Sequence, residues 1–268
     1  SQALVTAAVD LDRDGALDVL VGNDFSVRDQ VWHNDGGGEF APIDPFARSA
    51  AHPMSFDTGD VDGDGVEEMF LTDMRPATTD TARLAEWIPL MSTMNKLDNP
   101  TSHQKVRNVL QVPQADGTFR DDAERAGIDA AGWAWSARFG DLDNDGDVDL
   151  HVTNGMIAAE TFHYLANAEI VEPNIAFTNR GDGSFGIGDW GLGATGSGRG
   201  SVLVDLDLDG RLDVVVNNLD SPAVAFENRL CGGGSITVSL RQPGTGNTHA
   251  IGATVTLVDG DHRSLRTL

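Results

Sequence analysis

An acidic nine-residue motif, Asp-x-Asp-x-Asp-Gly-x-x-Asp/Glu, occurs four times and constrains the fold of this chain more than any other feature. The copies begin at Asp10, Asp60, Asp141 and Asp205, with a glycine at position 6 of each. Glycine tolerates the left-handed bend that lets alternate carboxylates converge. Carboxylates packed this closely are costly unless a cation lies among them. Ca²⁺ suits such a loop because it takes about six to eight hard oxygen ligands in flexible geometry.

The predicted metal ligands are the acidic side chains at positions 1, 3, 5 and 9 of each loop. They are Asp10, Asp12, Asp14 and Asp18; Asp60, Asp62, Asp64 and Glu68; Asp141, Asp143, Asp145 and Asp149; and Asp205, Asp207, Asp209 and Asp213. We expect about four Ca²⁺ ions, one per loop. All ligands of one ion come from one loop, which is typical of a structural ion; catalytic sites keep open positions.

The residues after each loop argue against EF-hands, which place a glutamate at position 12 and flank the loop with helices. Position 12 is Val21, Leu71, Val152 and Val216 in the four copies. Each belongs to a short apolar run, mostly β-branched, which is typical of a buried strand. Each loop is therefore predicted to join two strands.

The motif spacings of 50, 81 and 64 residues predict repeated supersecondary units. In the first unit, residues 3–9, 17–22, 30–34 and 39–42 read as four strands with tight connections, which is typical of a propeller blade. The third unit has the same order, with strands at 135–140, 149–153 and 175–179 and a glycine turn before Phe185. The predicted fold is therefore all-β, a series of β-propeller blades.

Two insertions, at residues 76–108 and 155–172, lengthen the spacing, and their role is open. Residues 80–96 have helical composition, with Pro89 expected to interrupt any single helix. Residues 156–168 are similar and place Glu160 and His163 one turn apart. We expect both insertions to project from one rim, between the second and third strands of their blades. Such loops often carry binding specificity.

Beyond residue 230 the pattern changes, and no acidic loop follows. Residues 232–235 read as a linker, residues 235–240 and 251–258 as strands, and residues 262–268 as the start of a third strand. We therefore predict two domains, a propeller over residues 1–230 and the truncated start of a small β module over residues 231–268.

The net charge of −24 makes nucleic acid and anionic membranes poor partners. Four calcium ions would add eight positive charges and still leave −16.

No apolar run is long enough to span a bilayer. The chain begins at Ser1 without a signal peptide, so we expect a mature product or an excised piece. Cys231 is alone, which excludes an internal disulfide. Calcium loops favour an extracellular, cell-surface or periplasmic location, where weak sites fill.

The loops and their flanks resemble FG-GAP repeats, also described as VCBS-type repeats. Residues 139–150 match best, including the pair Phe139-Gly140 that the other copies lack. Residues 246–257 resemble the start of an ASPIC/UnbV domain, which follows such repeats in cartilage acidic protein-like proteins. The first resemblance implies a propeller with Ca²⁺ between the first two strands of each blade. It also implies ligation by the position 7 carbonyls of Ala16, Val66, Asp147 and Arg211.

The resemblance leaves two points open. Glu68 stands where Asp is usual, and its longer side chain is expected to shift or weaken coordination there. Propellers of this type commonly have seven blades. The four visible blades are therefore either part of a longer chain or a small ring, since about four blades is the lower limit known.

No nucleophile–base constellation is apparent, so we predict no catalytic residues and no enzyme. The favoured function is an extracellular adhesion or recognition module for a protein or glycan, with structural calcium. The alternative is a scaffold or appendage of a secreted carbohydrate-active enzyme, with Trp133, Trp135, Glu160 and His163 as first suspects. A third interpretation is a spacer in a surface protein. The tryptophans are more typical of packing between blades, and His151 of a satisfied core histidine. The oligomeric state is open.

Overall fold

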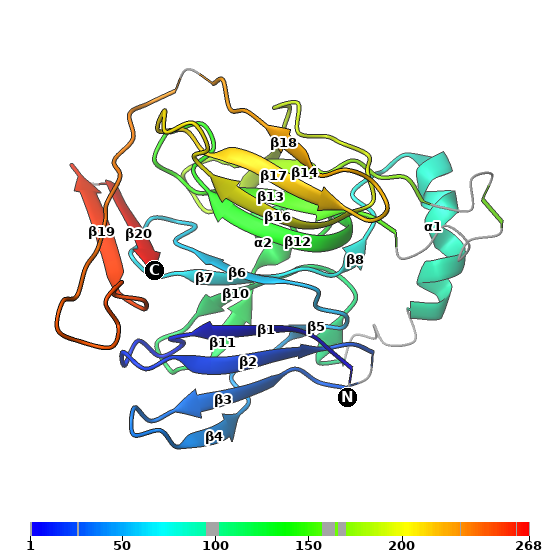
Figure 1. The fold of residues 1–268 in the computed structure, drawn as a ribbon. Coiled ribbons are helices and arrows are strands. Elements are labelled where there is room, and N and C mark those ends of the chain that lie inside the picture. Colours follow the sequence, from blue (N-terminus) through cyan, green and yellow to red (C-terminus); the bar gives the residue numbers. More distant parts are fainter. Residues whose placement is uncertain are drawn as a thin grey trace.

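The computed structural model describes residues 2–25, 27–94, 102–156, 164–165, 170–230, 232–260 and 262–267. Four antiparallel sheets form the blades of a β-propeller, which confirms the predicted fold class (Figure 1). Blade 1 contains β1 (Ala3–Val9), β2 (Asp18–Asn23), β3 (Gln30–Asn34) and β4 (Phe40–Ile43); blade 2 contains β6 (Phe56–Gly59), β7 (Glu68–Leu71), β10 (Val109–Pro113) and β11 (Phe119–Asp121). Blade 3 contains β12 (Gly132–Gly140), β13 (Asp149–Asn154), β14 (Ile175–Asn179) and β15 (Phe185–Gly188); blade 4 contains β16 (Gly198–Val204), β17 (Asp213–Asn218) and β18 (Val224–Phe226).

The acidic loops join the first two strands of each blade at one fixed register. In every blade the residue before the first Asp pairs with position 9 of the loop, as in Val9 with Asp18 and Gly140 with Asp149. The same pairing joins Gly59 to Glu68 and Val204 to Asp213. The side-chain period of a strand is two, so this register fixes which residues face the neighbouring blade.

The blades form an arc in chain order, and the first strand of each blade contacts the first strand of the next. The core lies between blades. Phe70 on blade 2 packs edge-on against Phe139 on blade 3, with ring centroids 6.1 Å apart. Ala137, Leu150 and Phe177 extend the same buried cluster. Apolar residues that alternate along each strand therefore hold the blades together.

The first insertion forms helix α1 (Thr81–Met94), with Pro89 inside it. The prediction that Pro89 would interrupt a single helix was wrong. A proline inside a helix removes one backbone hydrogen bond and often bends the helix without ending it. Tertiary contacts hold the helix here, because Trp87 is buried and its ring lies 6.2 Å from that of Trp133.

The two insertions lie on one rim, as predicted, and the structure also shows that they touch each other. Both leave their blades between the second and third strands, at the ends opposite the acidic loops. Arg83 of α1 donates to the carbonyl of Val171 at 3.1 Å, and the Tyr164 hydroxyl donates to the carbonyl of Glu86 at 3.0 Å. Glu160 and His163 lie outside the described residues.

Short elements brace the connections between blades. Strand β5 (Ser49–Ala50) pairs in parallel with β9 (Gln104–Lys105), and β8 (Met74–Arg75) extends the sheet of blade 3 by pairing with the start of β12. A single helical turn, α2 (Ala123–Ala126), leads from blade 2 into blade 3 and ends at the left-handed Gly127. No helix in the described part of the chain is both long and apolar enough to cross a membrane.

The tail folds into one hairpin, β19 (Thr254–Asp259) with β20 (His262–Thr267), beside the acidic loop of blade 2 (Figure 1). The amide of Leu265 donates to Asp60 Oδ2 at 3.1 Å. The strand expected at residues 235–240 does not form, because that segment has no pairing partner in this structure. The strand expected at 251–258 begins at Thr254, after a turn.

Candidate metal centres

The backbone of each loop turns through two left-handed residues. Position 6 is the predicted glycine, with φ between 86° and 102° in the four loops. Position 4 is also left-handed, at Arg13, Gly63, Asn144 and Leu208, with φ between 58° and 70°. The sequence signalled only the bend at position 6, because Arg13 and Leu208 at position 4 carry side chains that disfavour this region, whereas Gly63 and Asn144 tolerate it.

The position 1 carboxylate closes the turn by accepting hydrogen bonds from the backbone. In blade 3 the amides of Asp145 and Gly146 donate to Asp141 at 3.1 and 3.0 Å. The same pair of bonds occurs in the loops that begin at Asp10 and Asp205. In blade 2 the Gly65 amide donates to both oxygens of Asp60. These hydrogen bonds by themselves orient the position 1 carboxylate toward the inside of the loop.

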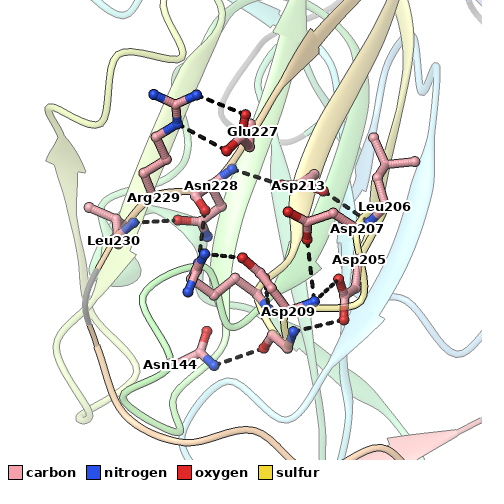
Figure 2. Close-up of polar contacts among 12 residues, drawn as sticks. Asn144, Asp205, Leu206, Asp207, Asp209, Asp213, Glu227, Asn228, Arg229 and Leu230 are labelled. Carbon is pink, nitrogen blue, oxygen red and sulfur yellow. Dashed lines mark hydrogen bonds and ion pairs between the residues drawn. The ribbon is translucent and has the colours of Figure 1, made fainter.

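The position 9 carboxylate ties the loop to the rest of its blade. Asp213 Oδ2 accepts the amide of Leu206 at 2.9 Å, and its Oδ1 accepts the amide of Asn228 at 2.8 Å (Figure 2). Asp18 makes the equivalent bonds in blade 1, with Leu11 and Asn34, and Asp149 makes them in blade 3, with Leu142 and Asn179. Glu68 accepts the amide of Val61 at 2.9 Å. All four position 9 side chains are buried.

The loops bring their carboxylates together in two arrangements. Oxygens at positions 1, 3 and 5 lie within 4.8 Å of one another in the loops of blades 1 and 4 (Asp10, Asp12, Asp14; Asp205, Asp207, Asp209). Oxygens at positions 1, 3 and 9 do so in blades 2 and 3 (Asp60, Asp62, Glu68; Asp141, Asp143, Asp149). The structure therefore does not bring position 5 of blades 2 and 3, or Asp213 of blade 4, into these groups.

The electrostatics of the loops fit a hard divalent cation. Burial first, and neighbouring carboxylates to a lesser extent, raise the pKa of Glu68 to about 8 and that of Asp149 to about 7. Asp143 Oδ1 is buried without a hydrogen-bond partner among the described residues. Buried carboxylate oxygens of like charge are stable only with a counter-charge, and carboxylate oxygen is the ligand type that Ca²⁺ prefers.

Two kinds of residue at these centres were missed by the sequence reasoning. His33 lies 3.2 Å from Asp18 and 3.5 Å from Asp12, and groups with both within 4.8 Å. The second kind is an asparagine: the backbone amides of Asn34, Asn179 and Asn228 each donate a hydrogen bond to the position 9 carboxylate of their blade. The sequence did carry a signal for them, since each ends an aromatic-x-Asn triplet before a turn. At position 7, Arg211 also pairs with Asp209 of its own loop.

Trp133, Trp135 and His151 are the other candidates from the sequence that the structure describes, and all three are packing residues. Trp133 is buried against Trp87, and Trp135 lies under Arg199 of blade 4, whose Cζ is 4.4 Å from the ring centroid. This confirms packing and leaves no open tryptophan platform at these two positions. His151 is fully buried, as expected. It is not satisfied, because neither ring nitrogen has a hydrogen-bond partner among the described residues.

Comparison with known proteins agrees with this geometry. The FG-GAP-like repeat family matches residues 10–71 and 102–152, which contain the first three acidic loops. The fold defines the class, a β-propeller, and two stretches of the chain match FG-GAP-like repeats. The chain is also similar to the crystal structure of the V. cholerae biofilm matrix protein Bap1, with 17% identity and a TM-score of 0.41. That similarity covers 87% of this chain but 30% of the other. No curated protein matches the chain.

Proposed function

We propose that this chain is a calcium-binding extracellular β-propeller that recognises a protein or a glycan, with calcium in a structural role. The observation that carries the proposal is the convergence of three carboxylates within 4.8 Å in every one of the four loops. Such groups repel one another without a cation, and the exterior of a cell supplies calcium at concentrations that fill weak loop sites. The proposed partners do not include nucleic acid, and the proposed function involves no insertion into a membrane.

A structural role for calcium follows from where the ligands come from. Each group of three carboxylates uses one loop, and the position 9 side chain also bonds the backbone of its own blade. An ion would therefore fix the first hairpin of a blade and its third strand together. We further propose that the position 7 carbonyls of Ala16, Val66, Asp147 and Arg211 complete the coordination.

Calcium titration by calorimetry tests this proposal. Asp143→Asn removes the charge of a side chain whose Oδ1 has no other described partner, and we expect it to weaken one class of sites. Asp44→Asn removes an exposed carboxylate that pairs with Arg28 and belongs to none of the four loops, and it is the matched control. The melting temperature should fall by many degrees in excess chelator. Equal calcium binding by both variants, with an unchanged melt in chelator, would overturn the proposal.

Recognition is assigned to the rim that carries the two insertions. A cavity of about 630 Å³ lies there, lined by Arg83, Glu172, Asn174 and Trp190 among others. Its size is within the usual range for small-ligand sites, roughly 300–1,000 Å³. An indole beside amide and charged groups suits a sugar residue or a peptide side chain.

A glycan array and a binding assay with candidate extracellular proteins test the recognition role. We expect saturable binding that Trp190→Ala weakens and Trp32→Ala, on blade 1, leaves unchanged. Turnover of a bound glycan would instead favour the alternative, a scaffold or appendage of a carbohydrate-active enzyme. Neither binding nor turnover would favour a spacer.

Two features support a larger assembly. The outward faces of the end blades carry Leu4 and Val202, which are 45% and 50% exposed. We propose that further blades, of a ring that commonly has seven, cover these faces. We also propose that the β19–β20 hairpin begins an ASPIC/UnbV-like module, with a domain boundary near residue 231.

A further inference from the structure

The interface between blades 2 and 3 is closed by a phenylalanine from the fourth strand of blade 3. Phe185, the first residue of β15, is 4% exposed. It packs in one cluster with Val61, Val148, Leu150 and Phe177. Phe119, the first residue of β11, fills the equivalent place between blades 1 and 2, in a cluster with Met69 and Leu71. The first residue of the fourth strand thus completes both interfaces.

The interface between blades 3 and 4 has the same wall residues but no fourth-strand residue. Leu142 occupies position 2 of its loop, as Val61 does, and Leu212 occupies position 8, as Val148 does. Val214 pairs with Phe226 across β17 and β18, as Leu150 pairs with Phe177 across β13 and β14. A cavity of about 470 Å³ lies among these side chains. It is lined by Leu142, Leu212, Val214 and Phe226, together with Trp190 and Leu192. We call this cavity the blade 4 seat.

Blade 4 begins the turn toward a fourth strand but does not complete it. Asn228 accepts the amide of Leu230 at 3.0 Å, as Asn179 accepts the amide of Gly181 at 3.0 Å. In blade 3 the turn then closes, and Asn179 pairs with Phe185. In blade 4 the chain leaves toward blade 3, where the amide of Gly233 donates to the carbonyl of Asn144. Among the described strands, β18 has β17 as its one neighbour.

The segment that follows has the pattern of the missing strand. Ile236, Val238 and Leu240 alternate with Thr237 and Ser239, and no described strand pairs with them. Ile236 and Val238 are 70% and 51% exposed. Such alternation suits a half-buried strand.

We propose that residues 236–240 leave the unpaired position that they have in this structure and add to β18 as the fourth strand of blade 4, with Ile236 inserted into the blade 4 seat. The register of blade 3 then pairs Asn228 with Ile236 and Phe226 with Val238. The connection from Asn228 is two residues longer than that from Asn179 to Phe185, and it contains three consecutive glycines that permit the longer turn. This covalent tether favours this segment over a strand from another molecule, because the local concentration of its own strand is high. The strand would place the end of the propeller at Leu240, and the boundary proposed near residue 231 would shift to that point.

Hydrogen exchange of the intact chain in millimolar calcium tests the proposal. Backbone amides at residues 236–240 should exchange about a hundred-fold more slowly than those of an unpaired segment. Exchange as fast as in the exposed residues 243–247 would overturn it. Protection that appears only at high protein concentration, with dimers in solution, would also overturn it, because the seat would then hold a second copy.

A pair of variants separates insertion from simple exposure. Ile236→Asp and Ile251→Asp alter two isoleucines that are 70% and 66% exposed in this structure. If both isoleucines are exposed in solution, the two Asp substitutions should have equal and small effects on the melting temperature. The proposal predicts that Ile236→Asp alone lowers the melting temperature and abolishes protection at 236–240. Ile236→Ala, a milder change, should reduce protection in part if Ile236→Asp does not fold. Equal melts for the two Asp variants contradict the proposal.

Discussion

The asparagine at or just after the end of the third strand in blades 1, 3 and 4 gives the sharpest quantitative prediction. Asn179 is buried, and its Nδ2 donates to the carbonyl of Val61 in the preceding blade at 2.8 Å and to that of Val148 in its own blade at 3.0 Å. Its Oδ1 accepts the amide of Gly181 at 3.0 Å. Asn179→Ala therefore removes three hydrogen bonds and leaves two buried carbonyls without a donor.

The expected cost follows from these contacts. An unsatisfied buried polar group costs about 1–3 kcal/mol, so Asn179→Ala should lower the free energy of unfolding by roughly 3–5 kcal/mol. Asn34 in blade 1 is the matched control. Its Nδ2 donates to one carbonyl, that of Leu17, and its Oδ1 accepts the amide of Gly36. Asn34→Ala should cost about 1–2 kcal/mol, since its site is partly open to water.

Urea unfolding in millimolar calcium measures both variants. Tryptophan fluorescence and circular dichroism should give coincident transitions, and the urea dependence should match that of the parent chain, so that the two free energies can be compared. The reasoning would be refuted if Asn34→Ala cost as much as Asn179→Ala, because the bond to the preceding blade would then contribute nothing.

Two further predictions concern backbone strain and pH. Leu208 is left-handed, with φ of 63°, and is 86% exposed, whereas loop 2 has Gly63 at the same position. Leu208→Gly should therefore stabilise the chain by about 1 kcal/mol in thermal unfolding, and a destabilised variant would contradict this account of the loop. Burial raises the pKa of Glu172 from 4.5 to about 7, against the Trp133 amide and Arg83, which lower it. A raised carboxyl pKa means that the fold disfavours the ionised form, so this contribution to stability is present below pH 4.5 and is lost as the pH rises through 7. Glu172→Gln should abolish that loss and be more stable at pH 8 by up to about 2–3 kcal/mol; identical pH profiles for variant and parent would count against it.

The sequence predicted those parts of the fold that local signals determine. The acidic loops and their flanking apolar runs were enough for the blades, and the bounds of β1, β3 and β14 agree with the prediction. The convergence of the position 1 and 3 carboxylates in all four loops also follows from local spacing.

The missed features depend on partners distant in the chain. A helix passes through Pro89 because Trp87 is anchored on blade 3, and no local rule reports that anchor. The asparagine contacts required knowing that the position 2 carbonyl of one blade faces the third strand of the next. The segment at 235–240 has strand propensity but is unpaired in this structure, and propensity alone does not report which strand it would pair with.

The asparagine contacts also give the arc a direction. Asn179 holds the loop of blade 2, and Asn228 holds the loop of blade 3 through the carbonyl of Leu142 at 2.6 Å. In both cases an asparagine of the later blade donates a hydrogen bond to a backbone carbonyl of the earlier blade. A ribosome delivers the chain in the same order, so each newly made blade finds its docking point already folded. The blades can then add to the propeller one at a time, in chain order.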